Sequence, residues 1–326
     1  MRKRPNILLF LTDEQRADHL GCYGNSILRT PHIDGIAQSG ARYDRFYTAV
    51  PVCMPNRASL ATGRMPSAHG VRQNGIPLPL ESTTFVDLLA AAGYRPAAIG
   101  KIHLQNIGDA PTDSRSLPGG EGQVSPPPEF AEAIKHDRMT DAYKAENIRA
   151  WQNNPRRQIS TPYYGFEHLR ICSGDGDMVE GHFTAWLSER HSDPASLKGP
   201  QHAYPADDYS VPQAYRTSMP EELYPTRYIE EETIAFIEEH SLNAPDSPFF
   251  VHCSFPNPHH PFTPPDPSKQ LFDRLLVHFA LVEKLRVRCR TERLTAKPII
   301  IFVHSRHSVP HYPVAATEGT SFGRKS

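Results

Sequence analysis

Residues 6–11 read NILLFL, an unbroken apolar run that ends at a polar Thr-Asp-Glu sequence. Such a run is typical of a parallel strand that is buried on both faces of a sheet. The segment PFFVHCS at residues 248–254 has the same character, and PAAIG at residues 96–100 predicts a further strand. Because ligand groups gather beyond the carboxyl ends of parallel strands, we expect functional residues to follow residue 11.

Helical patterns alternate with these strands. Helices are predicted over residues 34–40, 55–62, 84–92 and 222–240, the first with Asp34 as its N-cap. Glycine ends or follows the first three of them, as is common at helix C-termini. The alternation predicts an α/β fold with a mixed, mostly parallel central sheet and helices on both faces.

The chain has 326 residues, enough for one large domain or two ordinary ones. We predict one domain over residues 1–265, with irregular excursions at about 108–160 and 192–225 that begin in segments rich in Pro, Gly and Ser. Residues 266–326 differ from the rest. There we expect a helix over 269–290, a strand over 298–303 and an unpatterned end.

Composition excludes several classes of protein. The 35 basic and 36 acidic residues give a net charge of -1, so no charge excess favours nucleic acid or an anionic membrane as a partner. Five cysteines without CxxC spacing indicate neither a disulfide framework nor a zinc knuckle. The apolar run after the basic N-terminus is too short for a signal peptide or a membrane span. We therefore predict a cytoplasmic protein; the sequence gives no oligomeric state.

Two adjacent carboxylates, Asp13 and Glu14, follow the first predicted strand. Paired carboxylates repel each other unless a cation or a basic group lies between them, and hard divalent ions prefer such oxygen ligands. The alternative is a solvated loop that caps the next helix, and an isolated acidic pair is weak evidence for a metal site.

The segment CMPNR at residues 53–57 is more specific. A cysteine at a helix N-terminus faces the exposed N–H groups, and Arg57, four residues later, returns to the same side. Together Cys53 and Arg57 can hold an anion against a reactive side chain. The alternative is a buried, inert cysteine beside an unrelated arginine.

Four ordered motifs resemble the sulfatase family of the alkaline-phosphatase superfamily. They are RPNILLFLTDEQRADHLGCYGN, RTPHIDGIAQSGARYDRFY, PVCMPNRASLATGRMPSAHGV and GKIHL, all within residues 4–104. Weaker similarity continues through YYGFEHLR, GHFTAWL and FFVHCSFPNPHHPFTPP to about residue 265. The resemblance implies an alkaline-phosphatase-like fold and hydrolysis of a small-molecule sulfate ester.

The resemblance also implies a mechanism. Cys53 would be oxidised to formylglycine, whose hydrate attacks sulfur, and Arg57 would hold the hydrate and the anionic oxygens. Lys101 and His103 of GKIHL would contact the sulfate ester and the formylglycine hydroxyl. His259, or alternatively its neighbour His260, would bind or protonate the leaving oxygen.

The implied cofactor is a divalent cation, Ca²⁺ first and Mg²⁺ or Mn²⁺ as alternatives. Asp13, Glu14 and the modified Cys53 would be its ligands. Substrate contacts would come from Lys101 and His259, together with Asn74 of HGVRQNG. Asn74 lies where a phosphonate-hydrolysing branch of the superfamily has a substrate-contacting Asn, so a phosphonate or phosphate ester hydrolase is an alternative function.

The chain departs from the family pattern after residue 298. The strand PIIIF is followed by VHSRH at residues 303–307, where the family has an SDHG or SDN motif with two more metal ligands. Imidazoles such as those of His304 and His307 suit softer metals than Ca²⁺. We therefore expect an incomplete C-terminal portion. Residues 266–326 would be a divergent or frame-altered tail, in either a catalytically impaired sulfatase-like protein or a divergent working hydrolase.

Overall fold

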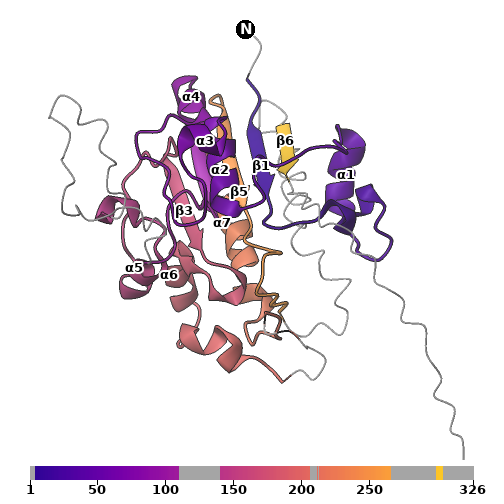
Figure 1. Ribbon diagram of the computed structural model, residues 1–326, viewed down its shortest axis with the longest axis vertical. Coiled ribbons are helices and arrows are strands. Elements are labelled where there is room, and N and C mark those ends of the chain that lie inside the picture. The colour runs from indigo at the N-terminus through magenta and orange to yellow at the C-terminus, as the bar shows by residue number, and fades with distance from the viewer. Residues whose placement is uncertain (1–3, 110–139, 206–210, 212, 266–298, 304–326) are drawn as a thin grey trace, which may run out of the picture.

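The computed structural model describes residues 4–109, 140–205, 211, 213–265 and 299–303 (Figure 1). Its centre is a six-stranded sheet in the order β4-β3-β2-β5-β1-β6. The strands are β1 (Ile7–Leu11), β2 (Arg95–Gly100), β3 (His168–Ser173), β4 (Glu180–Gly181), β5 (Phe249–Ser254) and β6 (Ile299–Val303). Neighbouring strands pair in parallel except β3 and β4, so the predicted mixed, mostly parallel α/β sheet is confirmed.

Strand β1 is an interior strand of this sheet. Leu9 lies opposite His252 of β5 on one side and opposite Ile301 of β6 on the other. The last four residues of β1 are buried, as the unbroken apolar run predicts for a strand covered on both faces. The strands predicted at residues 6–11, 96–100, 248–254 and 298–303 are therefore all present.

Seven α-helices surround the sheet. They are α1 (Pro31–Ser39), α2 (Cys53–Thr62), α3 (Pro66–His69), α4 (Phe85–Ala91), α5 (Ile148–Asn153), α6 (His182–Ser188) and α7 (Pro225–Asn243), all within the described part of the chain. Short 3₁₀ helices are η1 (Ala17–His19), η2 (Gly21–Tyr23), η4 (Asp141–Tyr143), η5 (Gly176–Met178), η6 (Pro194–Leu197), η7 (Pro200–His202) and η8 (Glu221–Leu223).

All four predicted helices exist, with shifted ends. Asp34 was expected to be an N-cap, and this is wrong: α1 begins earlier because Pro31 suits the first helical turn, and Asp34 instead accepts a hydrogen bond from the Cys22 N–H. Helix α2 begins at Cys53 rather than at residue 55, and its C-cap Gly63 adopts a left-handed conformation. Helix α4 begins at Phe85, after the N-cap Thr84, which forms a full capping box with Asp87.

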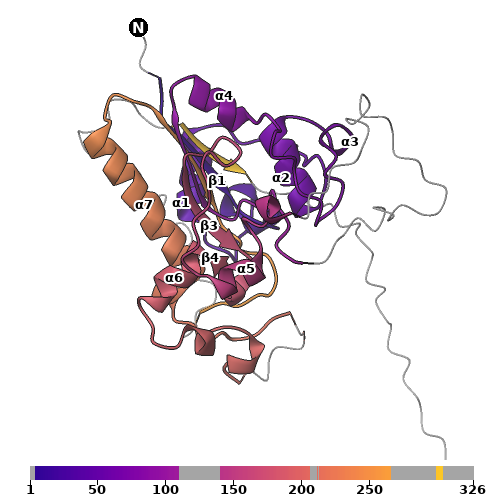
Figure 2. The same ribbon diagram turned by 90° about the vertical axis from the view of Figure 1, so that its left-hand side faces the viewer.

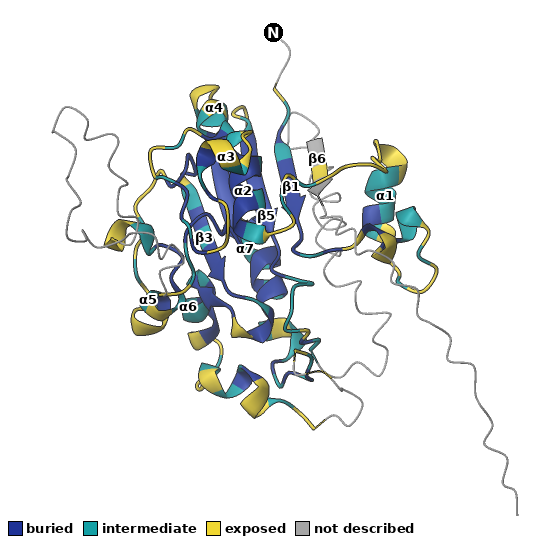
Figure 3. Ribbon diagram, viewed as in Figure 1, coloured by how far each residue is buried: buried dark blue, intermediate teal, exposed yellow. Residues whose placement is uncertain are grey.

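Helices cover both faces of the sheet, as predicted (Figure 2). On one face, α2 and α4 pack Met54, Ala58 and Val86 against residues such as Leu9 and Phe250. On the opposite face, α6 and α7 contribute a second apolar cluster of Phe183, Trp186, Leu187, Tyr228, Ile229, Phe236 and Ile237. Buried residues are concentrated in the strands and in the helix faces that meet them (Figure 3). The carboxyl ends of the five parallel strands therefore lie along one edge of the sheet.

The predicted excursions are partly structured. Helix α5 lies inside the segment 108–160, which was expected to be irregular, whereas the described residues between 192 and 224 form short 3₁₀ helices, isolated β-bridges and loops. The expected helix over 269–290 and the unpatterned end at 304–326 lie outside the described residues. Strand β6 belongs to the predicted tail yet pairs with β1, and the domain division at residue 265 stays a prediction.

Across the described parts of the chain, no helix is both long enough and apolar enough to span a lipid bilayer. The cytoplasmic location inferred from cysteine usage stays a prediction.

Candidate active site

A pocket of about 320 Å³ opens where β1, β5 and the start of α2 meet. Asp13 and Glu14 follow β1, and His259 and His260 follow β5. Cys53 and Asn56 come from the first turn of α2, and Asn74 comes from the loop after α3. The remaining lining residues are Val50, Pro51 and Val52. The pocket therefore lies at the carboxyl ends of adjacent strands, where sheets of this kind place their ligands.

Cys53 lies at the N-terminal end of α2 with Asn74 against it. The Asn74 amide contacts the Cys53 thiol, with the amide nitrogen 3.2 Å from Sγ. The Asn74 carbonyl oxygen also accepts a hydrogen bond of 3.1 Å from the Met54 N–H. Asn74 thus satisfies one of the N–H groups that a helix N-terminus leaves without a partner, and at the same time it fixes the position of residue 53.

A buried ion network lies behind the pocket. Lys101, whose exposed fraction is 1%, places Nζ 2.6 Å from a carboxylate oxygen of Asp13 and 2.6 Å from one of Asp175. Burial opposes ionisation of Asp13, but the Lys101 ammonium and the Arg57 guanidinium hold its pKa well below the ordinary value. Burial likewise opposes the charge on Lys101, yet Asp13 and Asp175 raise its pKa. Asp13 and Lys101 are therefore both charged at neutral pH.

The residue before Lys101 must be glycine. Gly100 has φ +102° and ends β2, and a Cβ at this position would lie 1.8 Å from the carbonyl oxygen of Ser254 in β5. This close approach lets the Lys101 N–H donate a 2.9 Å hydrogen bond to the same carbonyl. The backbone at the end of β2 is thus clamped to β5, and the Lys101 side chain is directed at Asp13.

Arg57 is buried beneath the pocket and does not line it. Its guanidinium donates to the Lys101 carbonyl at 2.6 Å and to the Ser254 hydroxyl at 3.0 Å, and it lies 3.6 Å from the Asp13 carboxylate. Arg57 therefore joins α2 to the ends of β2 and β5.

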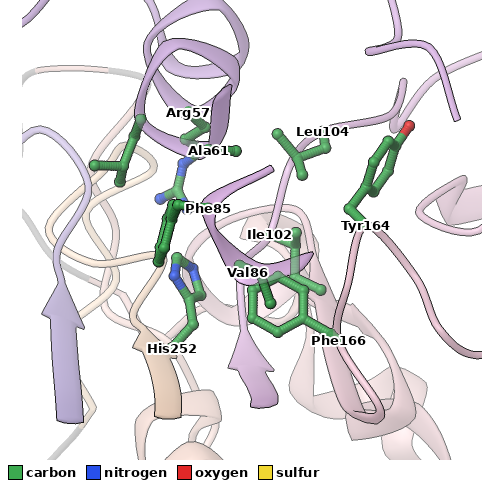
Figure 4. Close-up of a pocket in the computed structure, with 10 residues that line it drawn as sticks. Arg57, Ala61, Phe85, Val86, Ile102, Leu104, Tyr164, Phe166 and His252 are labelled. Carbon is green, nitrogen blue, oxygen red and sulfur yellow. The ribbon is translucent and has the colours of Figure 1, made fainter. Parts of the chain in front are cut away.

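Apolar residues surround the other side of Arg57. The Arg57 side chain reaches from α2 toward the His252 ring, next to Phe85 (Figure 4). A small cavity of about 20 Å³ lies among these residues, with Ile102 and Phe166 also on its wall. Burial and the positive charge of Arg57 lower the pKa of His252 to about 3, so this imidazole is neutral.

His103 is held by a buried carboxylate that sequence reasoning missed. Glu146 accepts hydrogen bonds from the backbone N–H groups of residues 103–105 and from the Tyr163 hydroxyl. His103 itself has φ +56°, a conformation that non-glycine residues rarely adopt. The four donors on Glu146 therefore hold the loop in a conformation that local preference disfavours.

The His103 ring is neutral. Burial, together with the positive charges of Lys101 and Arg57, lowers the pKa of His103 well below the ordinary value. Its ring atom Nδ1 is buried and has no hydrogen-bond partner within the described residues. A buried polar atom without a partner is costly unless a ligand satisfies it.

Three further side chains meet at the pocket wall. His259 Nε2 lies 3.3 Å from one carboxylate oxygen of Glu14, and His260 Nδ1 lies 3.4 Å from the other. The other ring nitrogen of His259 contacts the His260 carbonyl and lies 3.5 Å from Asp175. Asp175 therefore links His259 to the ion network around Lys101.

The residues at Asp13 suit a hard divalent cation. The Asp13 carboxylate is held ionised and lines the pocket beside Cys53, and carboxylate oxygen is the ligand such ions prefer. Glu14 lines the same pocket, but its carboxylate contacts two imidazoles.

Comparison with known proteins identifies the family. The sulfatase family model matches residues 5–274. The chain belongs to the sulfatase family. Its fold agrees with this assignment, because the structure is similar to that of the phosphonate monoester hydrolase of Agrobacterium radiobacter, with a TM-score of 0.54 at 24% identity, over 81% of this chain and 43% of that one. A Pseudoalteromonas sulfatase gives a TM-score of 0.52 at 19% identity, over 92% of this chain and 55% of that one.

The amino-acid sequence is also similar to those of known sulfatases. The arylsulfatase of Clostridium perfringens is 28% identical over 264 residues, which are 80% of this chain and 45% of that protein. Rat steryl-sulfatase is 38% identical over 129 residues, 36% of this chain and 22% of that protein. The chain therefore spans less than half the length of these two relatives.

The structure brings the predicted sulfatase-family residues together in two layers. Cys53, Asn74, Asp13, Glu14 and His259 line the pocket. Arg57 and Lys101 lie directly behind Asp13, and His103 lies close enough to both cations to be affected by their charge. Sequence reasoning did not identify Asp175, Glu146 or Ser254. Asp175 follows β3, a strand that was not predicted, and Glu146 lies in a segment expected to be irregular.

Proposed function

We propose that this protein hydrolyses a small-molecule sulfate ester through a formylglycine derived from Cys53, with a divalent cation, most suitably Ca²⁺, held near Asp13. The observation that carries the proposal is the placement of Cys53 and Asp13 on one pocket wall, with Lys101 and Arg57 directly behind Asp13. A sulfate group brings negative charge, and this arrangement supplies two buried cations close to the reacting position.

The proposed modification supplies the nucleophile. Hydration of the aldehyde gives two hydroxyls, one to attack sulfur and one to expel sulfate afterwards, and a divalent cation beside Asp13 would acidify the attacking hydroxyl. Residue 53 would reach sulfur from the first turn of α2, where the unpaired N–H groups of a helix N-terminus favour an anion. Asp13 and residue 53 would hold the cation, and Glu14 remains a candidate third ligand.

The chain's own residues orient the reacting groups. In this proposal Arg57 fixes the ends of β2 and β5, and Lys101 neutralises charge on the sulfate oxygens when a cation replaces it at Asp13. His103 presents its unpartnered ring nitrogen to the hydrate or the ester. Asn74 contacts residue 53 and a substrate oxygen. His259 gives a proton to the leaving oxygen.

Hydrolysis of a phosphonate or phosphate ester is a second candidate. Asn74 lies in contact with Cys53, which supports a substrate contact of the kind that the phosphonate-hydrolysing branch uses. The two ester classes share a tetrahedral anionic centre, so one pocket can accept both. The ratio of rates on an aryl sulfate and an aryl phosphonate monoester decides between them.

The test is an assay of the purified chain, expressed with a formylglycine-generating enzyme, on an aryl sulfate with and without added Ca²⁺. Cys53→Ala is the inactive variant. His202→Ala is the matched control, because His202 is exposed and outside the pocket. The proposal requires hydrolysis by the wild type and by the His202 variant. Equal rates in wild type and Cys53→Ala would refute it, and no hydrolysis by either would indicate a catalytically impaired sulfatase-like protein.

A further inference from the structure

Three metal-binding side chains meet at the wall of the pocket. Glu14, His259 and His260 each place one ligand atom so that all three atoms lie within 4.8 Å of one another. Glu14 follows β1, and the two histidines follow β5, so the parallel pairing of these strands brings the residues together. All three side chains are partly exposed and line the pocket, which leaves them accessible to an ion from solvent.

The distances favour coordination over a direct ion pair. The Glu14 oxygens lie 3.3 Å and 3.4 Å from the histidine nitrogens, whereas a charge-assisted hydrogen bond between such groups is about 2.7–2.9 Å long. Ligands about 2.0–2.1 Å from a tetrahedral metal ion are about 3.3–3.4 Å from each other. Each separation has the length of one ligand–ligand edge of a tetrahedral site, with Oε1 of Glu14 toward His259 and Oε2 toward His260.

The surroundings of His259 point the same way. Its Nδ1 faces the His260 carbonyl oxygen and, at 3.5 Å, the Asp175 carboxylate. Both ring nitrogens of His259 face oxygen acceptors, and a neutral imidazole with its proton on Nδ1 leaves the lone pair of Nε2 for a metal ion. Metal-binding histidines usually donate their other N–H to a carbonyl or a carboxylate in this way.

We propose that Glu14, His259 and His260 form a transition-metal site, best suited to Zn²⁺, at the wall of the pocket. Two imidazoles and one carboxylate form a donor set for Zn²⁺ and its neighbours in the first transition series, whereas Ca²⁺ requires six or more oxygen ligands. Three protein ligands leave a fourth position that faces the pocket. The hard-cation position at Asp13, whose carboxylate contacts Lys101 and Arg57, shares only its candidate ligand Glu14 with this site.

Occupation of this site has a consequence for catalysis, and this consequence rests on the proposed function. A metal ion on Nε2 of His259 takes the lone pair that would otherwise carry the proton for the leaving oxygen. Zn²⁺ is therefore an inhibitor, while binding itself does not depend on activity.

The test is titration of the full chain, without a histidine tag, with Co²⁺ in place of Zn²⁺. Visible absorption reports tetrahedral Co²⁺, and competition with Zn²⁺ gives the affinity for Zn²⁺. His260→Ala and Glu14→Gln each remove one ligand, and His202→Ala removes an exposed histidine outside the pocket. Thermal unfolding of each variant shows whether it is folded, and His260→Asn provides a second, less disruptive change at that position.

We expect one Co²⁺ per chain in the wild type and in His202→Ala, and at least about a tenfold weaker affinity in His260→Ala, His260→Asn and Glu14→Gln. No stoichiometric binding to the wild type, or equal affinity in all variants, would overturn the proposal. A chain that binds Co²⁺ in this pattern but fails to cleave aryl sulfates refutes the proposed function and leaves the metal site standing. A chain that cleaves aryl sulfates without binding Co²⁺ refutes the metal site and leaves the proposed function standing.

Discussion

Replacement of Glu146 by Gln is expected to loosen the loop that carries Lys101 and His103. The Glu146 carboxylate is fully buried and accepts three backbone hydrogen bonds from residues 103–105 and one from Tyr163. Gln has nearly the same shape, but its amide nitrogen donates and cannot accept. At least one buried donor is therefore left facing another donor.

The expected loss of stability follows from these contacts. A buried donor without a partner costs about 1–3 kcal/mol, and a hydrogen bond to a charged group contributes about 1.5–3 kcal/mol. Burial raises the pKa of Glu146 against the effect of its four donors, so a neutral side chain recovers part of the cost of burying a charge. We expect the free energy of unfolding to fall by about 2 kcal/mol, which lowers Tm by roughly 4–8 °C.

Thermal unfolding followed by circular dichroism measures this change. Glu239→Gln is the matched control: Glu239 is an exposed carboxylate whose ion pair with Arg95 is worth less than about 1 kcal/mol. A second readout is kcat on an aryl sulfate, which should fall for Glu146→Gln and stay constant for Glu239→Gln. If Glu146→Gln has the same Tm and the same kcat as the wild type, the argument that this carboxylate positions His103 is refuted.

Three further predictions follow from other parts of the site. Gly100→Ala is expected to give little folded protein, measured as soluble yield and Tm, because its Cβ would collide with the Ser254 carbonyl at 1.8 Å; a normal Tm would contradict this. In the folded chain the pKa of His252 is lowered to about 3. In the unfolded chain it returns to the ordinary value of about 6.5. Between these two pH values the unfolded chain binds more protons than the folded chain, so the free energy of unfolding rises with pH. Acidification from pH 7 to 5 therefore lowers the free energy of unfolding by about 2 kcal/mol through this residue. Urea unfolding of His252→Asn should show a shallower pH dependence, and an unchanged slope would be the contrary result. Finally, Zn²⁺ is expected to lower kcat on an aryl sulfate by occupying the imidazole of His259, and full activity at saturating Zn²⁺ would contradict that.

The strands beside the pocket could be predicted from the sequence because their composition is simple. Residues 6–11 and 248–254 are mostly apolar, as interior parallel strands require, and the polar residues after the first of them mark the position of Asp13. The helix that starts at Cys53 was predicted from Pro55 and Gly63, within two residues of its true start.

Strand β3 could not be predicted from its pattern. Its sequence HLRICS interrupts the apolar run with Arg170, whose guanidinium makes a 2.6 Å ion pair with Glu232 of α7. Pairing of that kind lets a charged residue occupy a partly buried strand, and a single sequence does not reveal the partner. Because β3 was missed, Asp175 at its end could not be placed near Lys101.

The loop at His103 was also beyond sequence reasoning. Its left-handed backbone and its dependence on Glu146, 43 residues away, are tertiary effects with no local signal. The resemblance to sulfatases identified His103 and Lys101 as site residues, but it did not indicate that a second carboxylate, Asp175, shares the Lys101 ammonium with Asp13.

The central claim is that residue 53, as an aldehyde, is the nucleophile of this pocket. Mass spectrometry of the tryptic peptide 46–57 measures the fraction of chains in which the Cys53 thiol has become an aldehyde. Preparations made with different amounts of a formylglycine-generating enzyme provide a range of this fraction. The account predicts that the rate of aryl sulfate hydrolysis per chain rises in proportion to the aldehyde fraction. Full activity in a preparation whose peptide carries only unmodified cysteine would contradict it.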